Sequence, residues 1–340
     1  MKVLYGIQAT GNGHISRCRI MAKYLKQQNI DVSYLVSGRA KKDLFDMEVF
    51  GDFQHRQGLT FVTNHGEVNY AATAVNNNLV RFIRDIYALD LEPYDVIITD
   101  FEPVTAWAGK LRNKTVIGIG HQYAFGLNTP LAGANPIAKM VMKYFAPANI
   151  SAGLHWHPFD ETIFPPIIDT SLTPTEQDGS ILVYLPFEDQ RLVTRLLRSF
   201  NGQEFILYSP ELEDKTLANV KQRKTCYAGF KHDLTKARGV ICNSGFELIS
   251  ECLHLGLPIL TKPIQGQMEQ LSNAKSLEQL GYAQVMDSLD GDVIATWLQQ
   301  LCPRQPRHFP DVAKALANWI ASGDWQTPSK LVAQIWPAAD

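Results

Sequence analysis

Long apolar segments are absent from this sequence. No stretch approaches the ~18 apolar residues that a membrane-spanning helix requires, so we expect no such helix. The apolar run within Met1–Ile7 is too short for the core of a signal peptide, and no small-residue cleavage site follows it. These absences predict a cytoplasmic protein.

The sequence also lacks a strong charge of one sign and a cysteine pattern. Its net charge is −2 at pH 7 and no block of like charges runs far, so we expect no nucleic-acid partner. Five cysteines are scattered without C-x-x-C spacing. An odd, unpatterned set favours reduced thiols in a cytoplasmic protein.

What is present is a regular alternation of strand-like and helix-like segments over 340 residues. One hydrophobic core rarely grows beyond about 250–300 residues, so we expect two domains. Continuously apolar runs such as Asp95–Thr99 and Thr115–Ile119 are typical of strands buried on both faces. Because they alternate with helical patterns such as Ile15–Gln28, we predict an α/β fold with doubly wound parallel sheets.

The predicted connection between the domains lies in Pro158–Gly179. This segment contains four prolines and interrupts the alternation, which favours an interdomain linker. A second set of strands and helices begins at Ile181. The expected parts are a first domain over residues 1–160, a linker over 161–179, a second domain over 180–325, and a C-terminal helix over 326–340 that can return to the first domain.

A glycine-rich loop follows the first predicted strand, Lys2–Ile7. It reads Gly11-Asn12-Gly13-His14 and leads into a helix. The two glycines let the backbone approach a ligand closely, and the helix N-terminus offers free N–H groups to an anion. A dinucleotide-binding fingerprint is not satisfied, because Ser16 replaces its third glycine and no acid ends the second strand. We expect no nicotinamide, flavin or other cofactor.

His14 and Asp100 are the candidate catalytic pair. His14 ends the loop above the carboxyl ends of the strands, where open α/β sheets bind ligands, and an imidazole suits general-base catalysis. Asp100 follows a buried strand and can orient His14 through a hydrogen bond. The alternatives are structural: His14 closes the loop, and Asp100 caps the helix that begins near Pro103. Glu102, also a possible base, and His121 are secondary candidates on the acceptor side.

A second polar cluster follows a strand in the second half of the chain. Ser244-Gly245 opens a helix with free backbone donors and little side-chain bulk, which suits a diphosphate. This helix carries Glu247 and, about two turns in, Glu251. Farther along, after another strand, Glu269-Gln270 lies at the start of the next helix.

The stretch Ala228–Ala283 resembles the C-terminal donor-binding region of GT-B glycosyltransferases, above all the UDP-glycosyltransferases and the MurG-type N-acetylglucosaminyltransferases. The shared elements are Ser244-Gly245, Glu251, Gly256-x-Pro258, Pro263, Glu269-Gln270 and Asn273-Ala274. The loop ending in His14, and Asp100 with Trp107, are similar to segments in the first half of those enzymes. The whole layout also resembles a bacterial and archaeal branch of predicted glycosyltransferases.

The resemblance implies two Rossmann-like domains facing a cleft, and an inverting transfer of a sugar from a nucleotide-diphosphate donor, with a UDP-sugar as the expected donor. His14 would deprotonate the acceptor hydroxyl and Asp100 would orient it. Glu251 would bind the ribose, Ser244 and Gly245 the diphosphate, and Glu269 and Gln270 the sugar. The full set of expected donor-site residues is Gly11, Gly13, Asn243, Ser244, Gly245, Glu247, Glu251, Glu269 and Gln270.

We expect no obligatory metal ion, because backbone donors are assigned to the diphosphate. Asp290-Gly291-Asp292 matches a metal-binding D-x-D motif, but we interpret it as a surface turn before a helix. Two departures from the family pattern concern the expected diphosphate site. Glu247, an acid where the plant-type signature has Asn, can repel a phosphate, and Pro186–Asp189 stands where MurG-type enzymes carry a Gly/Ser-rich loop.

Two rival functions stay open at this point. One is a nucleotide-sugar 2-epimerase or hydrolase, which the acids Glu102, Glu247 and Glu269 favour; the other is a non-catalytic sugar-nucleotide sensor. The acceptor is left as a glycan, a lipid or a small molecule. The segment Pro136–Pro147, with apolar residues at helical spacing and two lysines, predicts either a core-facing helix or a peripheral contact with membrane lipid.

Overall fold

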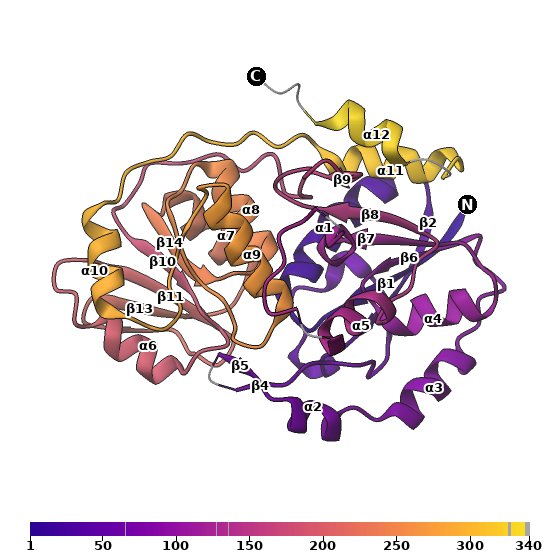
Figure 1. Cartoon of the computed structure of the whole chain (residues 1–340), viewed down its shortest axis with the longest axis horizontal. Helices are drawn as coiled ribbons and strands as arrows, with labels where there is room; N and C mark the ends of the chain where they lie inside the picture. Colours follow the sequence, from indigo (N-terminus) through magenta and orange to yellow (C-terminus); the bar gives the residue numbers. More distant parts are fainter. Residues whose placement is uncertain (65, 127, 135, 326–327, 337–340) are drawn as a thin grey trace.

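A computed structural model describes residues 1–64, 66–126, 128–134, 136–325 and 328–336 of the chain. Two seven-stranded sheets lie side by side, each covered by helices (Figure 1). The predicted fold class, two Rossmann-like α/β domains of the GT-B type, is therefore confirmed. Among the described residues, no helix combines the length and apolar character needed to cross a bilayer.

The first sheet is parallel throughout. Its strands are β1 (Lys2–Gln8), β2 (Asp31–Ser37), β3 (Gln54–His55), β6 (Val96–Asp100), β7 (Val116–Gly120), β8 (Ile150–Leu154) and β9 (Ile163–Phe164). Their spatial order is β3-β2-β1-β6-β7-β8-β9. The strand order reverses between β1 and β6, and this is the switch point beside which open α/β sheets bind ligands. The register pairs Ile7 with Asp100, so Asp100 ends its strand beside the loop that carries His14.

Helices and short elements surround this sheet. They are α1 (Asn12–Gln27), α2 (Tyr70–Asn76), α3 (Leu79–Ala88), α4 (Pro103–Leu111), α5 (Pro136–Tyr144), the 3-10 helices η1 (Lys41–Asp43), η2 (Glu48–Phe50) and η3 (His121–Ala124), and the hairpin β4 (Thr63–Asn64) and β5 (Glu67–Val68). Helix α4 begins at Pro103, as expected, but its cap is Glu102 rather than Asp100. Asp100 is therefore not needed as a helix cap.

The second sheet repeats the doubly wound pattern. Its strands are β10 (Ile181–Tyr184), β11 (Phe205–Ser209), β12 (Lys215–Leu217), β13 (Val220–Lys224), β14 (Gly239–Asn243), β15 (Ile259–Lys262) and β16 (Gln284–Val285), and its helices are α6 (Gln190–Leu197), α7 (Tyr227–Lys236), α8 (Phe246–Leu255), α9 (Met268–Gln279) and α10 (Gly291–Gln299). The order is β12-β13-β11-β10-β14-β15-β16, and β12 alone is antiparallel to its neighbour. Here the switch point lies between β10 and β14, directly before α8. Asp290 of the D-x-D sequence caps α10.

The chain returns to the first domain earlier than the expected boundary at residue 325. Helices α11 (Val312–Ser322) and α12 (Pro328–Ile335) lie over the first domain in Figure 1, and α11 packs against α1. The Trp336 indole donates a hydrogen bond to the Ile163 carbonyl oxygen at 2.7 Å. Ile163 belongs to β9, so part of the expected linker joins the first sheet. The end of the second domain and the start of the linker are therefore set by which segments pack on the first domain, and not by local composition.

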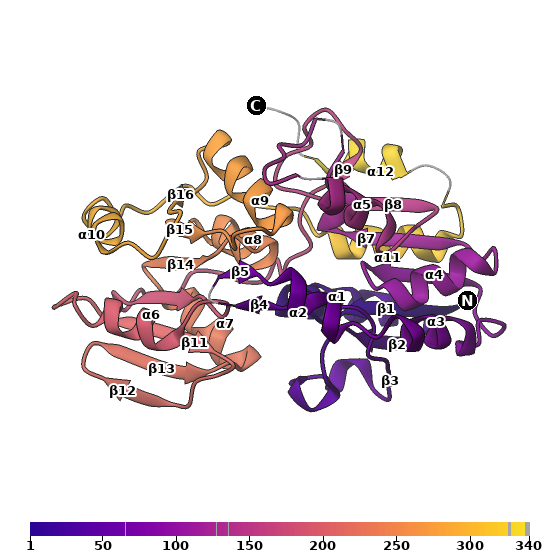
Figure 2. The same ribbon diagram turned by 60° about the horizontal axis from the view of Figure 1, so that its bottom comes forward.

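A hairpin of the first domain contacts the second (Figure 2). The Val68 N–H donates to the Gln265 carbonyl at 3.0 Å, the Gln265 N–H to the Gly66 carbonyl at 2.8 Å, and the Gly66 N–H to the Phe187 carbonyl at 2.7 Å. Elsewhere the Trp156 indole donates to the Ser250 hydroxyl at 2.8 Å. These contacts hold the carboxyl ends of the two sheets facing one another.

Candidate active site

A cavity of about 1030 Å³ lies between the two domains at the carboxyl ends of both sheets. The first domain contributes the loop Thr10–His14, and the second contributes the start of α8 and of α9. One wall is apolar. Phe145 stacks on Phe101 with centroids 5.1 Å apart and on Phe61 at 6.1 Å. Polar groups such as His14, Asn243 and Glu269 line other parts of the cavity among further apolar residues, so the cavity can receive an apolar group as well as a hydroxylated or anionic one.

Two helix N-termini from opposite domains meet at this cavity. Gly11 precedes α1 and Gly245 precedes α8; both have extended backbone angles, and neither helix has a side-chain cap. The two helices contact one another. A Cβ atom at Gly245 would meet no other atom within 4 Å, so the space before α8 is open. Uncapped N–H groups at such an end are free to bind an anion.

His14 and Asp100 form the pair that the sequence predicted. The His14 Nδ1 lies 2.6 Å from the Asp100 Oδ1, and Asp100 is completely buried whereas the His14 side chain keeps 14% of its exposure. With the proton on Nδ1, the Nδ1–H donates a hydrogen bond to the carboxylate, and the Nε2 lone pair is left for the Gln122 amide nitrogen, 3.5 Å away, or for a ligand in the cavity. Burial by itself raises the pKa of Asp100, but the charges of Arg17 and His14 outweigh burial and hold that pKa well below its usual range. Asp100 is thus a permanent anion.

Arg17 completes this cluster, and the sequence analysis assigned it no role. Its Nε donates to the Asp100 Oδ2 at 2.7 Å and its Nη2 to the Asp100 Oδ1 at 2.6 Å. Its Nη1 donates to the Glu247 Oε1, across the domain boundary. Arg17 is three residues after His14, on the same side of α1. An arginine at that spacing inside an otherwise apolar helix face is the sequence signal that would have found it.

Glu247 lies in the first turn of α8 and faces the first domain. A Cβ atom at Gly13 would lie 3.0 Å from the Glu247 Cγ, so the glycine loop touches this side chain closely. Burial raises the pKa of Glu247 to about 7, with Asp100 and Glu251 adding to the effect and Arg17 opposing it. Near neutral pH this carboxyl is therefore partly protonated, which reduces the repulsion toward a phosphate that its residue type suggests.

Other predicted donor-site residues line the cavity from the second domain. Glu269 accepts a hydrogen bond from the Gln122 amide at 2.9 Å, and that amide nitrogen is 3.5 Å from the His14 Nε2. Gln270 accepts from the Ile264 N–H at 3.0 Å. Asn243 donates to the Lys262 carbonyl at 3.0 Å. All three second-domain residues are therefore held in place by protein contacts.

Three buried amide oxygens that line the cavity have no hydrogen-bond partner among the described residues. They are the Oδ1 of Asn243 and the Oε1 atoms of Gln122 and Gln267. Buried acceptors of this kind are normally satisfied. Each can accept a hydrogen bond from a hydroxyl or N–H group of a bound ligand.

Two predicted donor-site residues lie outside the cavity lining. Ser244 is fully buried, and its hydroxyl is 2.9 Å from that of Thr261. Glu251 forms an ion pair with Lys231 of α7. The position of Glu251 therefore does not support the ribose contact that the resemblance implied, and a contact of Ser244 with a phosphate would have to come from its backbone.

The two candidates for the acceptor side are also engaged elsewhere. Both carboxylate oxygens of Glu102 cap α4, at 2.9 Å from the Val104 nitrogen and 2.7 Å from the Thr105 nitrogen, and Glu102 is fully buried away from the cavity lining. His121 lines the cavity, but its Nδ1 is 2.7 Å from the Leu154 carbonyl oxygen and its Nε2 is 2.6 Å from the Asn273 Oδ1. Glu102 is a structural cap, and His121 joins the two domains.

The loop after β10 differs from the expected phosphate loop, as the sequence indicated. Glu188 accepts a hydrogen bond from the buried Lys262 ammonium at 2.8 Å, and the Asn243 amide nitrogen is 3.3 Å from the same oxygen. Pro186 and Phe187 line the cavity. A buried ion pair therefore occupies the base of this loop.

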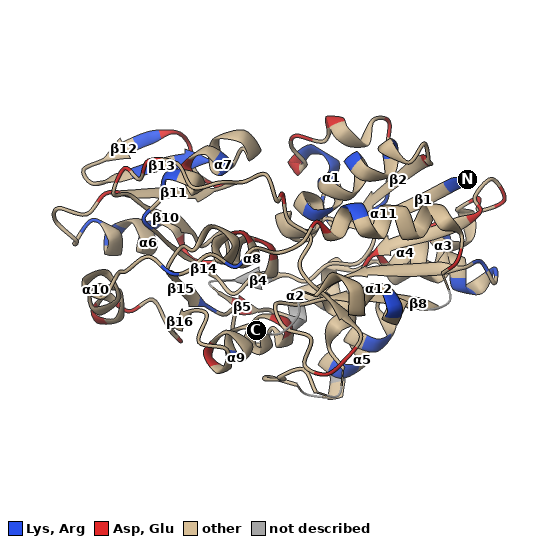
Figure 3. Ribbon diagram, turned by 90° about the horizontal axis from the view of Figure 1, so that it is seen from above, with Lys and Arg blue, Asp and Glu red and all other residues tan. Residues whose placement is uncertain are grey.

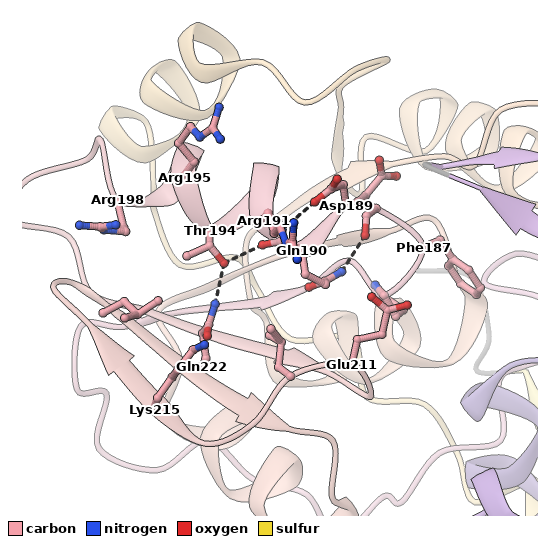
Figure 4. A pocket seen from close by; sticks show the side chains of 14 residues that line it. Phe187, Asp189, Gln190, Arg191, Thr194, Arg195, Arg198, Glu211, Lys215 and Gln222 are labelled. Carbon is pink, nitrogen blue, oxygen red and sulfur yellow. Dashed lines mark hydrogen bonds between the residues drawn. The ribbon is translucent and has the colours of Figure 1, made fainter.

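A second pocket, of about 780 Å³, lies on the far side of that loop. Figure 4 shows its centre, where the Gln222 amide donates to the Thr194 hydroxyl at 2.7 Å and that hydroxyl donates to the Gln190 carbonyl at 2.7 Å. Arg195 and Arg198 extend away from this centre (Figure 4). Arg191 and Lys215 also line this pocket, whereas His14 does not.

Charge and metal-ligand patterns add no further site. Basic and acidic side chains are interspersed over both domains (Figure 3). No group of three or more His, Cys, Asp or Glu side chains suitable for a metal ion occurs in the described part of the chain. On α5, Val141 and Met142 line the cavity whereas Met140 and Tyr144 are exposed. The predicted helix thus turns one face to the cavity.

Comparison with known proteins agrees with this architecture. The glycotransferase of kitacinnamycin superposes with a TM-score of 0.60 at 13% identity, covering 99% of both chains. The spinosyn rhamnosyltransferase SpnG, also solved with thymidine diphosphate, gives a TM-score of 0.56 at 14% identity, covering 98% of this chain and 99% of its own. MurG of Acinetobacter baumannii gives 0.54 at 16% identity, covering 98% of both chains. These similarities show the fold.

Sequence comparison gives the family. No curated protein matches the chain significantly. The sequence profile described as glycosyl transferase family 1 matches residues 1–302, which spans both domains and every candidate residue named above. The chain belongs to glycosyl transferase family 1.

Proposed function

We propose that the protein is an inverting glycosyltransferase that moves a sugar from a nucleoside diphosphate sugar, such as a UDP-sugar, to an acceptor hydroxyl without a metal ion. The observation that carries the proposal is the His14–Asp100 pair, held beside the uncapped N-terminus of α8 in one interdomain cavity. A base and an anion site that line the same cavity are what a single-displacement transfer needs.

The donor is assigned to the second domain. The α8 N-terminus, with the open space before Gly245, receives the diphosphate, and its backbone N–H groups stabilise the charge that develops on the leaving group. The unpartnered oxygens of Asn243 and Gln267 accept hydrogen bonds from hydroxyls of the sugar or from the nucleoside. Support for this class of ligand comes from SpnG, which has been solved with thymidine diphosphate.

The acceptor is assigned to the first domain. Its hydroxyl lies at the His14 Nε2, which takes the proton as the oxygen attacks the anomeric carbon, while the ionised Asp100 accepts a hydrogen bond from the Nδ1–H and stabilises the imidazolium that forms. The stacked rings of Phe61, Phe101 and Phe145 form the wall beside this position. We therefore propose that the non-reacting part of the acceptor is apolar.

The test uses a panel of nucleoside diphosphate sugars, with and without a panel of hydroxylated acceptors. We expect nucleoside diphosphate release that depends on an acceptor, and greater efficiency with apolar acceptors than with free sugars. Donor turnover at an equal rate without any acceptor would favour the 2-epimerase or hydrolase, for which Glu247 and Glu269 line the cavity. Donor binding without turnover under any condition would favour a sugar-nucleotide sensor.

A thermal-shift screen identifies the donor nucleotide before any acceptor is known. A ligand present at 100 times its dissociation constant adds about 2.7 kcal/mol to the stability of the folded protein. We expect stabilisation by a nucleoside diphosphate in EDTA. If stabilisation and turnover both required added magnesium or manganese, the metal-independent part of the proposal would be wrong.

A further inference from the structure

Arg17 lies where three functional groups converge. The edge of the Arg17 guanidinium formed by Nε and Nη2 donates to both oxygens of Asp100. Nη2 also lies 3.1 Å from the His14 Nδ1. The third nitrogen, Nη1, donates to Glu247 of the opposite domain. The Arg17 side chain is 2% exposed. His14 and Arg17 therefore share one carboxylate oxygen of Asp100, and Asp100 and Glu247 share the single positive charge of Arg17.

We propose that Arg17 is a positioning residue that sets the proton affinity of His14 and makes it depend on the second domain. Arg17 neutralises part of the charge that Asp100 offers to His14, and Glu247 counteracts Arg17 when it is ionised. This proposal concerns the electrostatics of the His14 ring. It rests on the proposed function only for its consequence, that the strength of the catalytic base depends on the position of α8.

The direction of each effect follows from charge. Removal of the Arg17 cation leaves Asp100 wholly to His14, which stabilises the imidazolium and raises the pH at which the ring loses its proton. Removal of the Glu247 anion has the opposite effect. The Arg17 contribution is the larger of the two, because Arg17 lies against His14 whereas Glu247 acts through Arg17.

The other charged or titratable groups around His14 do not produce this pattern. Cys18 donates to the Asp100 Oδ2 at 3.2 Å and is neutral, because burial raises its pKa. Glu269 reaches His14 only through the Gln122 amide. The remaining neighbours of the cluster are Tyr5 on β1, His121 on η3, Lys231 on α7 and Glu251 on α8. None of these groups contacts both Asp100 and a side chain of the second domain, as Arg17 does.

The test compares the parent with Arg17→Met, Glu247→Gln and the double variant. For each protein, the His14 ring is titrated by NMR between pH 5 and pH 9, and kcat/KM is measured over the same range. We expect Arg17→Met to move the titration of His14 and the acid side of the rate profile upward by roughly one pH unit. Glu247→Gln should move both downward by less, and the double variant should lie between the single variants.

Controls separate this role from a purely structural one. Lys26 lies on the exposed side of α1, so Lys26→Met removes the same charge from the same helix and should leave both profiles unchanged. The double variant removes the cation together with its partner and leaves Asp100 paired with His14, so it remains informative if Arg17→Met does not fold. Lowered thermal stability with an unmoved His14 titration in the folded variants would overturn the proposal.

The two readouts also distinguish the inference from the proposed function. A shifted His14 titration with an unmoved rate profile would keep the assignment of Arg17 and remove His14 as the base. An unmoved titration and an unmoved profile would remove Arg17 from the account while leaving the glycosyltransferase proposal in place.

Discussion

Helix α1 of the first domain and helix α8 of the second begin in the same way and contribute different chemistry. Each follows a strand at the switch point of its sheet, and each starts after an uncapped glycine, Gly11 or Gly245. On α1, the next turn carries His14 and Arg17, which bind Asp100. On α8, the space before the helix is open, and Glu247 faces the first domain instead.

This comparison shows how one topology serves two purposes. In the proposed function, the terminus of α8 binds an anion because no side chain fills the space before it, and the terminus of α1 carries a base because a histidine and its anionic partner lie there. Under this proposal the two roles differ because of a few side chains near each terminus and not because of the sheets. Variants that affect one half and spare the other test this division.

The largest expected effect breaks the cluster on the α1 side. Asp100→Ala leaves Arg17 and His14 without their shared buried anion, and removal of one partner of a buried ion pair costs about 3–5 kcal/mol. Urea unfolding measures this loss. Asp95→Ala, an exposed aspartate before the same strand, is the control and should cost less than about 1 kcal/mol. A loss below 1 kcal/mol for Asp100→Ala would show that the cluster is not a stabilising unit.

The next effect is a pH dependence of folding stability that comes from Glu247 on α8. The pKa of Glu247 is about 7 in the folded protein and 4.5 in an ordinary environment, so the folded state holds this proton more tightly than the unfolded state. Stability from Glu247 is present below pH 4.5 and is lost as the pH rises through 7. We expect the parent to lose about 3 kcal/mol more than Glu247→Gln between pH 4.5 and pH 7.5. Parallel stability curves for the two proteins would contradict the assignment.

A smaller effect compares the two glycines directly. A Cβ atom at Gly11 or at Gly245 meets nothing within 4 Å, and both backbones are extended, so valine fits at either site. If the diphosphate binds at α8, Gly245→Val should weaken nucleoside diphosphate binding tenfold or more, about 1.4 kcal/mol, and Gly11→Val should weaken it much less. Calorimetry gives both affinities. Equal losses would place the diphosphate between the two helices.

Features that depend on local sequence pattern could be predicted. Apolar runs separated by turn-forming residues predicted two doubly wound domains, and the glycine loop together with a carboxylate after a buried strand indicated His14 and Asp100. The start of α4 was also predicted, although its cap proved to be Glu102, because a carboxylate adjacent to Pro103 reaches the first N–H groups of the helix and Asp100 does not.

The remaining parts depend on contacts between distant segments. Arg17 and Glu247 are 230 residues apart, and no local pattern indicates that they meet. Glu251 matches the family pattern, yet Lys231 of the preceding helix holds it outside the cavity lining. Helix α11 returns to the first domain because it packs against α1. The apolar periodicity of α11 predicts a helix but does not indicate its packing partner.

The central claim is that His14 supplies the base while the second domain holds the donor. Single-turnover transfer at saturating donor, measured for His14→Ala and the parent, tests it most directly. We predict a rate lower by roughly 10²–10⁴-fold, the usual contribution of a positioned general base, with the nucleotide affinity of the variant unchanged. A His14→Ala enzyme that transfers sugar at the parental rate would contradict the account.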